Sequence, residues 1–186
     1  MDATTAMHQT FGIVDDLVAG LTPDDREKST PCTEWNVHEL INHMCGGGHG
    51  IASGLQGQAP PEGGPPDFLA DGPSAGWEAM KAHLAEAATP EILSATHQMP
   101  FGEVPGEMAL SVIVADHLTH AWDLAQATGQ GITVSDDLAA FAHGVWQNLV
   151  PAEGRPEEGG GFKPVVSVGD DASALDQLIG YTGRTP

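Results

Sequence analysis

One stretch of the sequence places ionisable side chains in a helical pattern that is otherwise almost entirely apolar. The segment "VIVADHLTHAWDLAQATG" carries Asp116, His117 and His120 among alanine, leucine and valine residues. Burying an ionisable group without a partner costs several kcal/mol, so three such groups need a reason. Asp116 and His120 are four residues apart and therefore share one face of a helix, about 5 to 6 Å apart at Cβ. That spacing predicts two ligands of one metal ion.

A third candidate ligand comes from an earlier helical pattern. In "EWNVHELINHM", His43 follows Val37 and Leu40 at helical spacing and so belongs near the buried side of its helix. Together with Asp116 and His120 it gives three nitrogen and oxygen ligands, the number typical of a catalytic zinc site with one open position. The same set of ligands also suits nickel, iron and manganese, so the ligand types do not select the metal. Zinc is the first choice and the other three are alternatives.

The same residues also have a purely structural interpretation. An inward-facing histidine is more often a hydrogen-bonded core residue than a ligand, and Asp and His four residues apart often bond only to one another. His117 lies about 100° around the helix from Asp116, so we do not expect it to share the site. Cys45 is turned away from His43 by the helical repeat and is excluded for the same reason.

Other conspicuous side chains are interpreted as structural. Trp122 and Asp123 are expected to be a packed indole and a polar anchor near the end of their helix. His49 follows a glycine triplet and is expected in a solvated loop, with a place at the mouth of the cavity as the alternative. His83 is expected on the surface or in the core. No residue is assigned to catalysis or to cofactor binding beyond the three metal ligands.

The composition is that of an acidic globular protein. Its 186 residues include 26 acidic and 6 basic side chains, for a formal net charge of −20. This charge repels nucleic acid and anionic lipid, so we expect a small-molecule substrate or thiol as the partner, with no nucleic acid and no membrane. The sequence shows neither a transmembrane run nor a secretory leader, which predicts a cytoplasmic protein. We expect residues 1–186 to form a single domain, with Cys32 and Cys45 as free thiols.

Apolar residues at helical spacing predict the elements that must position these side chains. We expect a small hairpin between Ile92 and Pro105 and long Gly/Pro-rich loops after Gln56 and Pro151. Four substantial helices without alternating strands predict an all-α four-helix bundle, whose sites are formed by inward side chains of facing helices. The expected helices are 4–20, one that begins after Thr33 or Asn36 and reaches the Gly46 to Gly48 triplet, 73–89 with Ser74 as its cap, 106–128, 135–149, and a short one in "SALDQLIGYTG".

The sequence resembles the DinB/YfiT-like superfamily of metal-binding four-helix bundles. The resemblance rests on "EWNVHELINHM" and "ADHLTHAWDLAQATG" and extends to the closing "DDASALDQLIGYTGRTP". Within the superfamily, the sequence is most similar to actinobacterial proteins that resemble the N-terminal domain of mycothiol-dependent maleylpyruvate isomerase. The family's motifs imply that His43, Asp116 and His120 are the metal ligands. Asp116 stands where the family commonly has a glutamate.

The resemblance implies that the metal activates a low-molecular-weight thiol such as mycothiol for attack on an electrophile. The isomerases have a further C-terminal domain that this sequence lacks, which argues against isomerase activity itself. The remaining expectations are a thiol transferase, an isomerase-like hydrolase, or an enzyme of unknown substrate. The loop expected from Gly46 to Pro73 and the hairpin near Phe101 should shape the pocket. A homodimer is one expected state. Two alternatives stay open: a non-catalytic metal-binding or small-molecule-binding stress-response module, and a metal-free bundle.

Overall fold

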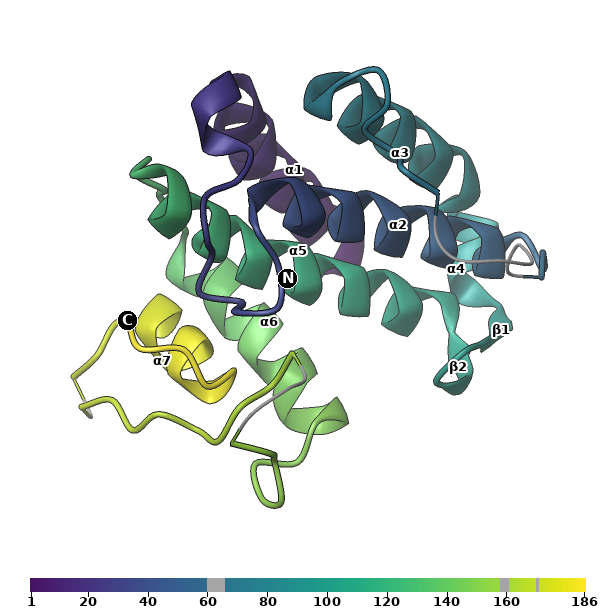
Figure 1. Ribbon diagram of the computed structural model, residues 1–186. Coiled ribbons are helices and arrows are strands. Elements are labelled where there is room, and N and C mark those ends of the chain that lie inside the picture. Colours follow the sequence, from purple (N-terminus) through teal and green to yellow (C-terminus); the bar gives the residue numbers. More distant parts are fainter. Residues whose placement is uncertain (60–65, 158–160, 170) are drawn as a thin grey trace.

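The computed structural model describes residues 1–59, 66–157, 161–169 and 171–186 (Figure 1). Helices account for most of these residues, and the sheet consists of one antiparallel pair of strands. The elements are α1 (Ala3–Ala19), the 3-10 turn η1 (Pro23–Asp25), α2 (Val37–Leu55), α3 (Pro73–Ala87), α4 (Pro90–Ser94), β1 (Thr96–Met99), β2 (Gly102–Pro105), α5 (Gly106–Thr128), α6 (Asp136–Leu149) and α7 (Ala174–Tyr181).

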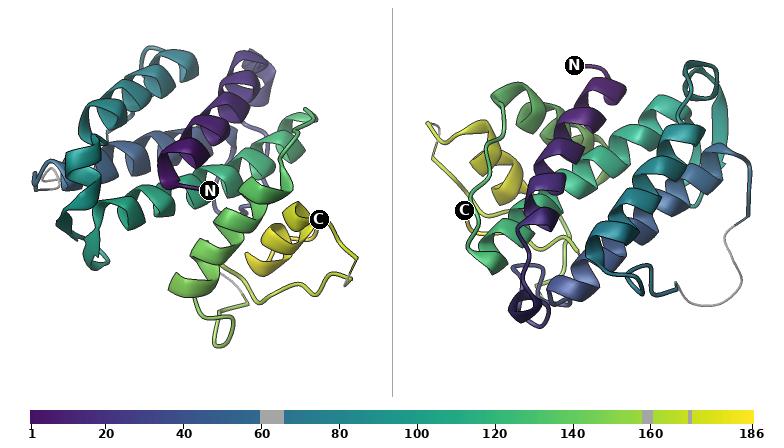
Figure 2. Two further views of the ribbon diagram at one scale, coloured as in Figure 1. Left: turned by 180° about the vertical axis from the view of Figure 1, so that it is seen from behind. Right: turned by 90° about the horizontal axis from the view of Figure 1, so that it is seen from above.

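Four helices form the core, which confirms the expected all-α bundle with a small hairpin. Helix α5 packs against α1 and α2, and α3 packs on α2. Helix α6 continues from α5 and packs against it, and α7 packs on α6. Seen from behind and from above, α6 and α7 gather toward one end of α5, and the β1–β2 hairpin lies at the other end (Figure 2).

Helix α2 continues without a break through the Gly46 to Gly48 triplet. A capping box fixes its start: Oδ1 of Asn36 accepts a hydrogen bond from the backbone of Glu39, and Oε2 of Glu39 accepts one from the backbone of Asn36, each 2.9 Å long. A Cβ atom at Gly48 would lie 2.3 Å from Sδ of Met80 on α3. Glycine at this position therefore allows α3 to approach α2 closely.

Helix α5 is enclosed along most of its second half. Ala115, His117, Leu118 and Leu124 have no exposed surface, because α1, α2 and α6 cover the helix from different sides. The helix ends where Gly129 adopts a left-handed conformation with φ of 73°, as helices commonly do. Because water is excluded along this helix, its polar side chains must find partners within the protein.

Two local expectations are wrong. Ser74 does not cap α3: the cap is Gly72, and Pro73 occupies the first turn, where its missing N–H costs nothing. Ile92 does not begin the hairpin but belongs to α4, which Thr89 caps through its side-chain oxygen. Parts of the expected Gly/Pro-rich loops, at 60–65 and 158–160, lie outside the described residues.

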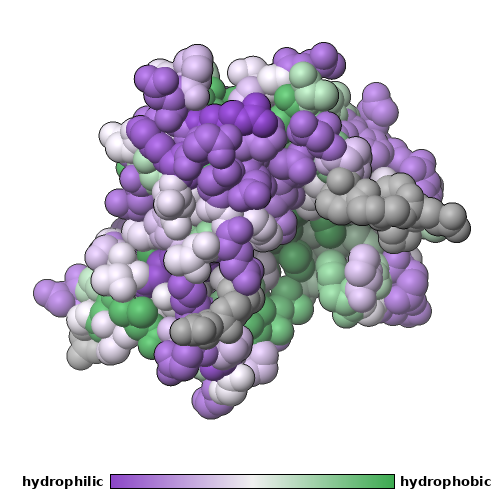
Figure 3. Space-filling model, in the orientation of Figure 1, coloured by the Kyte–Doolittle hydropathy of each residue, from purple (hydrophilic) through white to green (hydrophobic). Residues whose placement is uncertain are grey.

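The surface is hydrophilic over much of one face (Figure 3). Hydrophobic residues show on that face mainly in a hollow between the C-terminal helices and the hairpin. In the ranges that the structure describes, no helix combines the length and the apolar character needed to cross a membrane.

Close packing at Gly76 can be tested by adding one methyl group. A Cβ atom there would lie 2.4 Å from the carbonyl oxygen of Phe68, whereas one at Gly12 on α1 would have nothing within 4 Å. We expect Gly76→Ala to lower the free energy of unfolding by about 1 to 3 kcal/mol through overpacking. Gly12→Ala should raise it by about 0.5 to 1 kcal/mol through helix propensity. Urea denaturation measures both, and a stabilised Gly76→Ala variant would contradict the packing.

Candidate metal centre

Three side chains from two helices meet between α2 and α5. His43 lies on α2, Asp116 and His120 lie on α5, and one ligand atom of each lies within 4.8 Å of the other two. Nε2 of His43 and Nε2 of His120 are each 3.5 Å from Oδ1 of Asp116. The two imidazole rings are nearly perpendicular, with centroids 5.1 Å apart. The structure therefore brings together the three residues that the sequence analysis names as candidate ligands.

A second carboxylate fixes the tautomer of His120. Nδ1 of His120 donates a hydrogen bond to Oδ2 of Asp123 over 2.9 Å, so Nε2, on the side of Asp116, is the nitrogen that the neutral ring offers to a metal. Arg184 holds the same carboxylate by a bidentate pair, with Nε 3.0 Å from Oδ1 and Nη2 2.8 Å from Oδ2. A carboxylate behind a histidine in this way orients the ring and raises its basicity toward a metal.

Opposing effects set the protonation of these groups. Burial acts to raise the pKa of Asp116, but His120 and His43 outweigh it and hold that pKa well below its usual value. Burial also acts to raise the pKa of Asp123, and hydrogen bonds from His120 and Arg184 leave that pKa lowered. The pKa of Arg184 is raised, because its pairing with Asp123 outweighs its burial. Both carboxylates are therefore ionised at neutral pH.

The donor set fits a divalent cation. Oδ2 of Asp116 is buried and has no hydrogen-bond partner within the described ranges, an arrangement that costs free energy unless another group pairs with the oxygen. An ionised carboxylate with a free oxygen and a neutral imidazole that offers Nε2 are the donors that zinc and related ions use. His43, Asp116 and His120 are the residues that would hold such an ion.

Cys32 forms a second group with His120 and Asp123, whose ligand atoms also lie within 4.8 Å of one another. This group suits a metal less well. Both oxygens of Asp123 already accept hydrogen bonds from Arg184. Burial raises the pKa of the Cys32 thiol, which disfavours the thiolate that binds metals. Both cysteines are free, as the sequence predicts, and burial raises the pKa of Cys45 to about 12.

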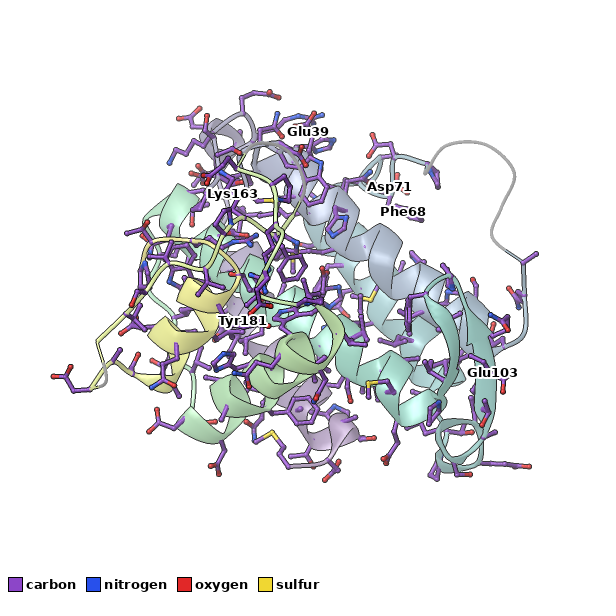
Figure 4. All side chains as sticks on the ribbon, turned by 90° about the horizontal axis from the view of Figure 1, so that it is seen from below. Glu39, Phe68, Asp71, Glu103, Lys163 and Tyr181 are labelled. Atoms are coloured by element: carbon purple, nitrogen blue, oxygen red, sulfur yellow. The ribbon has the colours of Figure 1, made fainter. Side chains whose placement is uncertain are left out.

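A groove along α2 touches the centre at His43 alone, because Asp116 and His120 are not among the residues that line it. Trp35 stacks on His43 with ring centroids 4.1 Å apart and covers one face of the imidazole. His43 also forms part of the wall of the groove, which has a volume of about 1260 Å³ and extends to Met99 in β1. Figure 4 shows Glu39 near the start of α2 and Phe68 on the segment that enters α3, and both residues line this groove. The sequence predicts that residues from Gly46 to Pro73 shape the pocket, and glycines of that stretch do line the groove. These glycines belong to helix α2, not to a loop.

His117 is not part of the three-residue centre and forms its hydrogen bond with α2. Its Nε2 lies 2.9 Å from the carbonyl oxygen of Met44 on α2 and donates to it, and its ring packs against Phe11 and Trp77. Burial lowers the pKa of His117 to about 4, despite the opposing charge of Asp116. His117 is therefore a neutral histidine that connects α5 to α2.

Three residues have roles that the sequence analysis did not assign. Asp123 is not only an anchor near the helix end, because it orients His120. Its position three residues after His120 is a detectable signal for such contact, whereas nothing local points to Arg184. His49 lies within α2 rather than in a solvated loop, and its Nδ1 is 2.9 Å from Nδ1 of His83 on α3.

The fold and the donor set define the class: a DinB-like helical bundle with a candidate metal centre between two of its helices. The chain belongs to the family described as the mycothiol maleylpyruvate isomerase N-terminal domain, part of the DinB/YfiT-like superfamily, which it matches over residues 8–125. The matched region contains the three candidate ligands and Asp123, whereas Arg184 lies beyond it.

Two relatives come from Mycobacterium tuberculosis, one from strain CDC 1551 and one from strain H37Rv, and both are described as uncharacterised proteins. Each is 35% identical over 170 residues, which cover 91% of this chain and 90% of the relative. No solved structure matches the chain.

The support of His120 by Asp123 can be tested without removing a ligand. Asp123→Asn keeps the shape of the side chain but loses the charge that holds the His120 proton on Nδ1. We expect it to weaken zinc binding by about 10- to 100-fold. Asp16→Asn, at an exposed position on α1, is the matched control and should bind zinc as the wild type does. Competition with a chromophoric chelator measures both affinities, and an unchanged affinity in Asp123→Asn would contradict the role of this carboxylate.

The buried state of His117 predicts a pH dependence of stability. Its pKa falls from 6.5 to about 4 on folding, so between these values the unfolded state binds the proton and the folded state does not. Stability should therefore fall as the pH drops from 6.5 toward 4, by up to about 3 kcal/mol from this residue. Denaturation of metal-free wild type and His117→Leu across this range measures the effect, with exposed His8→Leu as the control. Parallel profiles for wild type and His117→Leu would refute it.

Proposed function

We propose that the protein is a metal-dependent enzyme that uses a low-molecular-weight thiol as a nucleophile, in group transfer or isomerisation. The observation that carries the proposal is the position of His43, which belongs both to the three-residue centre and to the wall of the groove. A molecule in the groove can therefore contact one of the three candidate ligands. Mycothiol is the proposed thiol because the family to which the chain belongs is described by a mycothiol-dependent isomerase.

The residues of the centre have separate parts in this proposal. His43, Asp116 and His120 hold a divalent ion, with zinc as the first choice and nickel, iron and manganese as alternatives. Such an ion, when bound, lowers the pKa of a thiol or water and supplies a nucleophile at neutral pH. Asp123 keeps the proton of His120 on Nδ1, away from the ion. Trp35 covers one face of the His43 ring and keeps water from that side.

The size of the groove and the charge of the chain support a small molecule as the partner. The groove, at about 1260 Å³, is somewhat larger than most ligand pockets, which leaves room for an elongated ligand. A net charge of −20 disfavours nucleic acid and other polyanions. A cytoplasmic location belongs to the proposal, since thiols are kept reduced in that compartment.

The first test is the metal content of the gently purified protein. We expect about one ion per chain, by the site's donor count, and loss of that ion in His43→Ala and in His120→Ala. His8→Ala, at an exposed position on α1, should keep it. Removal of the ion with a chelator should lower the melting temperature, because an ion that binds only the folded state stabilises it. Elemental analysis and thermal denaturation measure these effects.

Wild-type protein that contains no metal and takes up none of the four candidate ions would exclude the metal-dependent proposal. Protein that binds metal and thiol but accelerates no transfer to an electrophile would instead indicate a non-catalytic binding module. Thiol consumption with a panel of electrophiles separates this outcome from enzymatic activity.

A further inference from the structure

A pair of hydrogen-bonded histidines lies in the same groove as the metal centre. His49 on α2 and His83 on α3 both line the groove, and their Nδ1 atoms are 2.9 Å apart. The ring of His49 also stacks on Phe68, with centroids 4.9 Å apart. Six residues separate His49 from His43 along α2, which corresponds to about 9 Å along the helix axis. The pair is therefore a second polar position at a distance from the centre.

Neighbouring side chains determine which nitrogens of the pair carry protons. Oε1 of Gln56 accepts a hydrogen bond from Nε2 of Gln58 over 2.9 Å. The same oxygen lies 3.3 Å from Nε2 of His83, so this nitrogen is the donor and carries a proton. Nδ1 of a neutral His83 is then an acceptor. The proton shared between the two rings must therefore belong to Nδ1 of His49.

This tautomer leaves Nε2 of His49 as an acceptor. Burial, with the charge of His83 as a smaller effect, lowers the pKa of His49, which keeps the ring neutral at neutral pH. Nε2 makes no hydrogen bond to any residue in the described ranges. An unprotonated nitrogen that lacks a protein partner and belongs to a residue of the groove wall can accept a hydrogen bond from a ligand.

Between His43 and His49, the groove is lined by glycines of α2 on one side and by a hydrogen-bonded segment on the other. Gly46 and Gly50 line it. A Cβ atom at Gly50 would have nothing within 4 Å, whereas one at Gly46 would lie 3.1 Å from the ring of Phe68, which forms the wall there. Asn42 holds the wall, because its Oδ1 accepts a hydrogen bond of 2.7 Å from the backbone of Phe68 and its Nδ2 donates one to the carbonyl of Pro66. An extended chain can therefore lie along α2 between His43 and His49.

We propose that His49, oriented by His83 and Gln56, binds the far end of an elongated groove ligand by accepting a hydrogen bond from a hydroxyl or ammonium group of that ligand. This inference rests on the proposed function, which places a thiol at the other end of the ligand, near His43. A carboxylate is excluded from this position, because it has no proton to donate and faces a lone pair. The acidic side chains of Glu39 and Asp67, which also line the groove, disfavour it further.

A series of straight-chain thiols of similar length with different far ends tests the proposal. The probes are 6-mercaptohexanol, 6-aminohexanethiol, 6-mercaptohexanoate and 1-heptanethiol, titrated calorimetrically into zinc-loaded wild type and His49→Phe. In the wild type, the hydroxyl-ended probe should bind more tightly than the methyl-ended one. We expect His49→Phe to reduce this preference by about three- to tenfold, the usual effect of one hydrogen bond. The amine should behave as the alcohol does, and the carboxylate should bind least well to the wild type.

Several results would overturn this assignment while leaving the proposed function intact. One is that the substitution His49→Phe changes the dissociation constants of the hydroxyl-ended and methyl-ended thiols by the same factor. Another is a ¹⁵N NMR spectrum in which His49 carries its proton on Nε2. A third is a second metal equivalent that depends on His49, since it would place an ion where the shared proton lies. If none of the thiols changes the absorption spectrum of the cobalt-loaded protein, the proposed function fails instead.

A steric variant tests the path of the ligand along α2. Gly50→Leu places a side chain in open space on the groove floor, and we expect it to weaken binding of 6-mercaptohexanol by about tenfold or more, as one large clash does. Binding of zinc and of the short thiol 2-mercaptoethanol should be unchanged. Gly12→Leu, on α1 and away from the groove, is the control for leucine in an open helical position. Equal binding of the long thiol by both variants would contradict the path.

Discussion

The imidazole of His120 is the constraint on which the rest of the site depends. Its Nδ1 is committed to Asp123 and its Nε2 faces Asp116, so one ring divides its two nitrogens between two carboxylates. Arg184 compensates the charge of Asp123 in the core, where an unpaired carboxylate would cost several kcal/mol. The C-terminal segment therefore contributes to the centre although it supplies no candidate ligand. The fold places this arrangement on α5, the helix that contacts α1, α2 and α6.

The glycines of α2 connect the packing of the bundle to the groove. Gly48 lets Met80 of α3 approach the helix, and His83 on the same helix α3 lies beside His49. Gly46 and Gly50, on the groove side, leave the backbone of α2 as a floor. The same stretch of helix thus does two things at once: it packs tightly on one side and leaves space on the other. His43 stands at one end of that space, covered by Trp35.

Much of the fold follows from local patterns in the sequence, because helical periodicity and caps act within a few residues. The bundle, the hairpin and the glycine that ends α5 were predictable in this way, whereas Ser74 was assigned wrongly because Pro73 begins the helix. The pairing of Asp116 with His120 follows from their spacing, but their role as ligands stays a prediction. Arg184 and the partner of His49 could not be found from the sequence, since 61 and 34 residues separate the bonded atoms along the chain.

X-ray absorption spectroscopy of the zinc-loaded protein, without added thiol, identifies the atoms that bind the metal. We expect a shell of nitrogen and oxygen atoms only, with outer scattering from two imidazole rings, because His43, Asp116 and His120 form the centre. A sulfur atom at about 2.3 Å from zinc would contradict this expectation. That result would instead assign the metal to the group formed by Cys32, His120 and Asp123.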